Sequence, residues 1–173
     1  IKSMTSLSGT VMAIASPNSP ASIRVLHYTG GTWSIKASPS NSVYGTCMRN
    51  LNGTLFAVRT ASSVIKSTDG GMTWTGSSAG TATNNIHKYI QCLANTGNTF
   101  FAGTLGGRIF KSTDGGANWS TVYNIGDNNG FYGINDFYVF NSTTIFAATD
   151  SGVVYTTNSG TSWARYNAGL NFG

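Results

Sequence analysis

The stretch STDGGMTW, residues 67–74, recurs almost unchanged as STDGGANW at residues 112–119, and a third version, TTNSGTSW, covers residues 156–163. The final tryptophans of these stretches are 119 − 74 = 45 and 163 − 119 = 44 residues apart. A weaker copy, HYTGGTW, ends at Trp33, which lies 74 − 33 = 41 residues before the next tryptophan. A nearly constant period of this length indicates a repeat architecture in which each repeat is one small structural unit.

Each repeat contains short apolar segments separated by turns rich in glycine, asparagine and aspartate. In the clearest repeat, strands are predicted at residues 86–94, 99–104, 108–113 and 119–124. Four antiparallel strands in about 40–45 residues are typical of one blade of a β-propeller. We therefore predict an all-β protein, a β-propeller built of four-stranded antiparallel blades. Four blades are expected, at residues 1–40, 41–85, 86–130 and 131–173, in a single propeller domain or propeller segment that covers residues 1–173.

Large apolar residues recur at matching places in two strands of the repeat. In the second strands they are Phe56, Phe101 and Phe146, and in the third strands they are Ile65, Phe110 and Val154. Blades bury their faces against one another because a single blade cannot form a core alone. We interpret these residues as the core between blades.

The repeated stretch has the composition of a tight turn between the third and fourth strands. An aspartate such as Asp69 accepts hydrogen bonds from nearby backbone N–H groups, and the hydroxyl of Ser67 adds local bonds. Gly70 and Gly71 adopt positive φ without steric cost. Trp74 is expected to start the fourth strand and to pack its ring between sheets.

The pattern S/T-x-D-x-G-x-T/S-W resembles the Asp-box, or bacterial neuraminidase repeat, of sialidase-like, sortilin-like and photosystem-assembly-factor-like propellers. The matching residues are Ser67, Asp69, Gly71 and Trp74, then Ser112, Asp114, Gly116 and Trp119, then Thr156, Asn158, Gly160 and Trp163. Asn158 replaces the usual aspartate, and the copy near Trp33 lacks it. In the family the box is structural and lies away from the catalytic face, so the resemblance implies a fold rather than an activity.

The acidic residues argue against catalysis. All five acids are aspartates and the chain has no glutamate, whereas the resemblance to sialidases would require a tyrosine nucleophile with a glutamate partner. A glucanase would need two carboxylates beside the scissile bond. Asp69 and Asp114 belong to turns, and we interpret Asp127, Asp136 and Asp150 as structural too. We expect no enzyme activity, and the alternative is a glycosidase-like propeller fragment, of sialidase or glucanase type, whose catalytic residues lie in missing blades.

The charge distribution narrows the choice of partners. The net charge of +5 comes from ten Lys and Arg that are scattered singly. The chain has no basic run of the kind that would predict nucleic-acid binding. The sequence also has no apolar run of about 18 residues, the length that would predict a membrane span. A charged content of 9% favours an extracellular or cell-surface protein.

The two cysteines, Cys47 and Cys92, occupy matching places in neighbouring repeats, 92 − 47 = 45 residues apart. Equivalent positions in adjacent blades are usually too far apart for a disulfide, so we predict two buried thiols. Neither His27 nor His87 stands at metal-ligand spacing from them, and we predict neither a metal nor a cofactor.

Loops that lead into the first strand of a blade are candidates for a binding face, because loops carry function in propellers. The candidate residues are Asn84, Asn85, His87, Lys88, Asp127, Asn128, Asn129, Phe131 and Tyr132. Their amide and aromatic groups suit a glycan ligand. Three sequons, at Asn52, Asn118 and Asn141, are candidate glycosylation sites.

The ends of the array predict the partners of the protein. The final residues, NAGLNFG at 167–173, are typical of a linker to a further blade, and an open array exposes apolar faces that drive association. We expect either further blades of a longer chain or copies that form an oligomer or filament. The predicted function is therefore that of a non-catalytic binding or self-assembly module, with glycans as one candidate ligand. A protein-binding scaffold is the second alternative.

Overall fold

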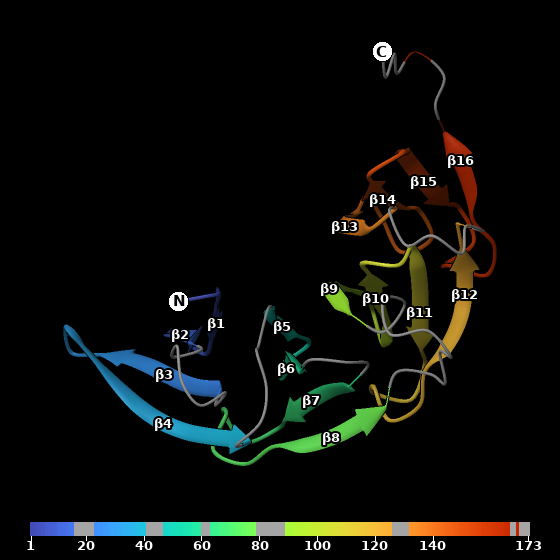
Figure 1. Cartoon of the computed structure of the whole chain (residues 1–173). Helices are drawn as coiled ribbons and strands as arrows, with labels where there is room; N and C mark the ends of the chain where they lie inside the picture. The colour runs from blue at the N-terminus through green and yellow to red at the C-terminus, as the bar shows by residue number, and fades with distance from the viewer. Residues whose placement is uncertain are drawn as a thin grey trace. The chain divides into compact units, whose positions relative to one another are not determined.

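The computed structural model describes residues 1–15, 23–40, 47–59, 63–78, 89–125 and 132–166, together with Gly169. The chain forms two compact units, Ile1–Ser77 and Ser78–Gly173. The described elements are sixteen strands in four antiparallel four-stranded sheets, and the described ranges contain no helix (Figure 1).

Each sheet is a meander whose strands pair in chain order. Sheet 1 consists of β1 (Ser3–Leu7), β2 (Thr10–Ala15), β3 (Ile23–Thr29) and β4 (Thr32–Ser40). Sheet 2 consists of β5 (Met48–Leu51), β6 (Thr54–Arg59), β7 (Ser63–Ser67) and β8 (Thr75–Ser78). Sheet 3 consists of β9 (Ile90–Thr96), β10 (Thr99–Thr104), β11 (Arg108–Ser112) and β12 (Ser120–Asn124). Sheet 4 consists of β13 (Ile134–Val139), β14 (Ile145–Thr149), β15 (Gly152–Thr156) and β16 (Ala164–Tyr166).

Two-residue loops close the first hairpin of sheets 1 and 2. Ser8 and Gly9 join β1 to β2, and Asn52 and Gly53 join β5 to β6, all four with positive φ between 49° and 80°. Positive φ at both central residues defines the type I′ turn, whose twist matches that of the flanking strands. The meander is therefore encoded locally in the turn residues.

In the first unit, apolar side chains of sheets 1 and 2 meet in one core. Met12 and Ile14 from β2 pack with Met48, Leu55 and Ile65 from sheet 2. Asn50 in β5 also links the first strands of the two sheets. Its backbone N–H donates to Thr5 Oγ1 at 3.1 Å, and its side-chain amide donates to Ser6 O at 2.8 Å.

In the second unit, sheets 3 and 4 share an equivalent core. Phe101 and Ile109 from sheet 3 pack with Ile134, Ile145 and Val154 from sheet 4. Of the six residues predicted to form the core, five are buried: Phe56, Ile65, Phe101, Phe110 and Val154. The prediction is wrong in part for the sixth, Phe146, which is only half-buried because it lies on the face of sheet 4 that points away from this core.

Each fourth strand in sheets 2, 3 and 4 begins one residue after the tryptophan that was predicted to start it. The indole N–H groups of Trp74 and Trp119 donate to the carbonyls of Gly71 and Gly116 at 2.9 and 3.1 Å. These bonds hold the tryptophans in the turn rather than in the strand ladder. Trp33 differs, because it lies inside β4.

Cys47 and Cys92 are both buried and form no disulfide, which agrees with the prediction of two buried thiols. In the described part of the chain no helix has the length and apolar character that crossing a membrane requires. Among the same residues no group of three or more His, Cys, Asp or Glu side chains could hold a metal ion.

Candidate binding surfaces

The turn at residues 67–74 is held by a compact hydrogen-bond network around one carboxylate. Asp69 Oδ1 accepts from the backbone N–H groups of Met72 and Thr73 at 3.0 and 2.9 Å, and from the Ser67 hydroxyl at 2.7 Å. Ser67 Oγ in turn accepts from the N–H of Gly71 at 2.8 Å. The carboxylate of Asp69 and the hydroxyl of Ser67 thus tie both ends of the turn together.

The same network recurs twice in the second unit with some residues replaced. At residues 112–119, Asp114 Oδ2 accepts from the side-chain amide of Asn118 at 2.7 Å, where the first turn has a threonine hydroxyl. At residues 156–163, Asn158 Oδ1 takes the place of the carboxylate oxygen, and its Nδ2 donates to Ser162 Oγ at 2.8 Å. An amide thus preserves the geometry without the charge.

The hydrogen bonds in these turns favour the ionised carboxylates. Donation from the side chain and the backbone N–H of Thr73 and from the hydroxyl of Ser67 lowers the pKa of Asp69 from 3.8 to about 2. Donation from the backbone and side chain of Asn118 lowers the pKa of Asp114 even further. Both carboxylates are therefore charged at neutral pH.

These pKa shifts predict acid sensitivity. Both groups have folded pKa values below the unfolded value of 3.8, so their contribution to stability is complete from about one pH unit above that value. It is lost as the pH falls through the folded pKa, about 2 for Asp69, because the unfolded chain binds protons first. We expect the free energy of unfolding, measured by urea denaturation between pH 2 and 7, to fall below about pH 4.5.

The control for this prediction is the double variant Asp69→Asn/Asp114→Asn, which copies the natural Asn158. Its stability should change less steeply with pH in the same acidic window, because two of the protons taken up on unfolding are gone. An equally steep pH dependence in both proteins would contradict the assignment to these turns.

The predicted loop face lies almost wholly outside the described residues. Asn84, Asn85, His87, Lys88, Asp127, Asn128, Asn129 and Phe131 fall there. Tyr132 is described and is exposed. A glycan site on these loops stays a prediction.

The three sequons differ in their surroundings. Asn52 is exposed in a hairpin loop, and Asn141 is exposed with its Oδ1 accepting from the backbone of Thr143 at 2.9 Å. Asn118 is different, because the Nδ2 that would carry a glycan donates to Asp114. A glycan at Asn118 would therefore disrupt the turn.

One face of sheet 4 carries an exposed aromatic surface. Residues opposite one another in adjacent strands share a face, and the ladders pair Tyr138 with Phe146, Phe146 with Tyr155, and Val153 with Tyr166. Tyr138 and Tyr166 are 66% and 52% exposed. The rings of Phe146 and Tyr155 stack with centroids 6.1 Å apart. We call these five residues the end face of sheet 4.

Sheet 1 exposes a second apolar face. The apolar residues that share it, by the pairings of β1 to β4, are Met4, Val11, Ala13, Leu26, Tyr28, Trp33 and Ile35. Tyr28 and Trp33 form a ring pair with centroids 5.3 Å apart, and Trp33 is 45% exposed. We call this set the end face of sheet 1.

The register of the ladders shows that the two end faces are of opposite types. In sheet 1, the pair Ala13 and Leu26 lies on the end face, whereas the equivalent pair of sheet 4, Ala147 and Val154, packs against sheet 3. Conversely, Phe146 on the end face of sheet 4 matches Phe101, which sheet 3 buries against sheet 4. Inside a unit, a face of one type packs against a face of the other type. The two end faces are one of each type.

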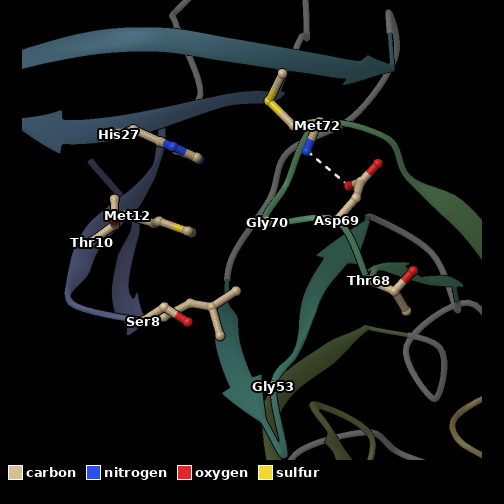
Figure 2. Close-up of a pocket in the computed structure, with 10 residues that line it drawn as sticks. Ser8, Thr10, Met12, His27, Gly53, Thr68, Asp69, Gly70 and Met72 are labelled. Carbon is tan, nitrogen blue, oxygen red and sulfur yellow. Dashed lines mark hydrogen bonds between the residues drawn. The ribbon is translucent and has the colours of Figure 1, made fainter.

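A cleft of about 510 Å³ lies within the first unit, between sheet 1 and the turn that follows β7. Figure 2 shows Met12 and His27 projecting into it from sheet 1, with Gly70 and Met72 on the opposite side. His27 is only 9% exposed, and its Nε2 has no hydrogen-bond partner among the described residues. Burial and the positive charge of Lys36 lower the pKa of this histidine, and the backbone of Gly70 opposes them. The imidazole is therefore neutral at pH 7.

Sequence reasoning missed both the end faces as defined sets and the cleft. A signal for the cleft was present, because His27 pairs with Met12 where Lys111 pairs with Phe101. Only the register of the ladders reveals that these pairs are equivalent, since the first repeat has the weakest turn motif.

Comparison with known proteins gives a likeness in structure only, since no family model and no curated protein matches the sequence. The extracellular domain of a hybrid two-component system from B. thetaiotaomicron is 12% identical, with a TM-score of 0.69 over 94% of this chain and 21% of that one. YCF48 from Cyanidioschyzon merolae is 14% identical, with a TM-score of 0.65 over 98% of this chain and 60% of that one. The GH74 enzyme of Niastella koreensis is 21% identical, with a TM-score of 0.63 over 94% of this chain and 24% of that one.

The chain therefore spans between about a fifth and three fifths of these solved structures. These neighbours are β-propellers, and at such identities the likeness shows the fold alone. The sheets of this chain have the fold of a β-propeller fragment.

Proposed function

We propose that this chain is a non-catalytic module of the Asp-box propeller type that self-associates, with the end face of sheet 4 docking on the end face of sheet 1 of a second copy. The observation that carries the proposal is the pair of exposed apolar faces of opposite type. Contiguous exposed apolar surface of this kind marks interaction sites.

The internal packing of each unit supports this docking mode. Sheet 3 covers the apolar face of sheet 4 with Phe101 and Ile109, whose equivalents on the end face of sheet 4 are Phe146 and Val153. A contact between the two end faces would thus repeat an interface that the chain already uses. Because the two surfaces differ, the contact is heterologous and produces a ring or a filament.

The aspartates support a non-catalytic role. Asp69 and Asp114 are saturated by turn donors. Asp150 accepts from the N–H of Gly133 and from Asn135 at 2.7 and 2.6 Å. These carboxylates hold loops together, and a glycosidase role would require acids elsewhere. Two observations support an extracellular location: the low content of charged residues in the chain, and the extracellular domain among the similar structures.

Sedimentation equilibrium over a range of protein concentrations tests the proposal. The variant Tyr138→Ser/Tyr166→Ser removes two exposed rings from one end face, and Trp33→Ser/Ile35→Ser alters the other. We expect each to weaken self-association at least about tenfold, because buried aromatic anchors dominate binding energy at interfaces.

Mixing the two variants gives the sharper test. In a heterologous contact, each variant keeps one intact face, so the mixture should form a one-to-one heterodimer although neither variant associates alone. The control variant Tyr89→Ser removes a ring that is 42% exposed, close to the 45% of Trp33, but directly precedes β9 of sheet 3 and so lies off both faces, and it should associate normally. A wild-type protein that stays monomeric at all concentrations would overturn the proposal.

A further inference from the structure

The cleft of the first unit has a filled counterpart in the second unit. The ladders pair Met12 with His27 in sheet 1 and Phe101 with Lys111 in sheet 3, at the same register. Phe101 is fully buried, and its ring lies directly against Gly160 in the turn of sheet 4. Smaller side chains at the equivalent positions of sheet 1 leave the space open.

The turn opposite the cleft shows the same difference. A Cβ at Gly71, the equivalent of Gly160, would meet only ordinary contacts, with Leu55, His27 and Val25 at 3.4 to 3.5 Å. At Gly160 the same atom would overlap the ring of Phe101. The turn at Gly71 thus has more room in front of it than the turn at Gly160, where the Phe101 ring fills the space.

In the second unit the equivalent space holds an ammonium group of the chain itself. Lys111 Nζ donates to the carbonyl of Ser159 at 2.8 Å, across the gap from sheet 3 to the turn of sheet 4. Gly70 is the equivalent of Ser159, because each is the fourth residue of its copy of the repeated turn. In the first unit the neutral His27 faces Gly70 without completing a hydrogen bond through Nε2.

The two turns also differ in charge, and the difference favours a bound cation in the first unit. The second unit supplies its own cation beside the neutral Asn158. The first unit has the ionised Asp69 in its turn and a neutral histidine in place of the lysine. Lys36 lies close enough to His27 to oppose a cation there, but it is exposed and its charge is screened by solvent.

We propose that this cleft binds a primary alkylammonium group, which takes the place that the Lys111 side chain has in the second unit. An ammonium group offers three donors, and the cleft is lined by Gly70, Thr10 and His27, of which the His27 Nε2 is buried without a partner among the described residues. The methylene chain would lie against Leu7, Met12 and Met72, which line the same cleft; Met12 and Met72 are labelled in Figure 2. The inference depends on the first unit alone and not on the association of copies.

Two sources could present this group: a free alkylamine and the side chain of a lysine in a partner peptide. Titration of ¹⁵N-labelled protein with n-butylammonium and with N-acetyl-lysine methylamide, followed by NMR, distinguishes them. We expect n-butylammonium to shift the amide signals of Gly70 and Gly71 with a Kd on the order of 1 mM, as for a small ligand held by few contacts. Preference for the lysine derivative by tenfold or more would assign the cleft to peptides, and equal or weaker binding would assign it to free amines.

Neutral n-butanol is the matched control ligand, and binding as tight as that of n-butylammonium would overturn the proposal, because the cleft would then be merely apolar. The variant Met12→Phe/His27→Lys copies the second unit into the first and should reduce n-butylammonium affinity at least tenfold. His27→Lys alone, which supplies only the internal ammonium, should do the same and serves if the double variant does not fold. Unchanged affinity in a folded variant would place the binding elsewhere and contradict the assignment.

Discussion

Replacing Gly103 with alanine is expected to destabilise the protein by about 3 kcal/mol, the upper end of the usual range for overpacked cores. Gly103 lies in β10, and a Cβ there would come within 2.5 Å of Ile134 Cγ2 and 2.6 Å of Cys92 Sγ. Both neighbours are buried in the core between sheets 3 and 4, so neither can move without opening that core. The measurement is the free energy of unfolding from urea denaturation.

Gly76→Ala is the matched control, because it makes the same chemical change in another strand. Nothing lies within 4 Å of a Cβ at Gly76, and the φ of this residue is not positive. Alanine there should leave stability unchanged or raise it by about 0.5 kcal/mol, since it restricts the unfolded chain. A loss at Gly103 no larger than at Gly76 would mean that sheets 3 and 4 are packed less tightly than the structure shows.

Much of the fold could be predicted because its determinants are local. The repeated turn at residues 67–74 contains its own donors, acceptors and positive-φ glycines. Strands such as β1 and β15 alternate in burial with the period of two that a strand requires. These features do not depend on distant parts of the chain, so the repeat period and the turn residues together define the four sheets.

The distribution of volume between repeats could not be predicted. The pair of buried residues two apart in the second strand is Met12 and Ile14 in sheet 1 but Phe101 and Gly103 in sheet 3. The large and the small member of the pair are thus arranged differently in the two sheets. Whether such a pair leaves a cleft depends on the partner strand and on the facing turn, as with His27, and these meet only in the folded unit.

Phe101→Ala is expected to cost about 3–5 kcal/mol, the range for truncating a fully buried phenylalanine. The Phe101 ring is 0% exposed and lies 6.0 Å from the ring of Trp163 and 6.3 Å from that of Phe137, measured between centroids. The three rings come from β10, from β13 and from the turn before β16, so truncation leaves a cavity that no single side chain can fill. Urea denaturation measures the loss.

Phe146→Ala is the comparison that connects this prediction to the proposed association. Phe146 occupies the position of Phe101 one repeat later, but it is half-buried on the end face of sheet 4. In a monomer its truncation should cost less, about 1 kcal/mol, because part of its apolar area stays in water after folding. If a second copy covers this face, Phe146 becomes buried as Phe101 is, and the cost should rise with protein concentration. A cost for Phe146→Ala that is independent of concentration would show that this face stays open, although its ladder is built like the one that sheet 3 buries.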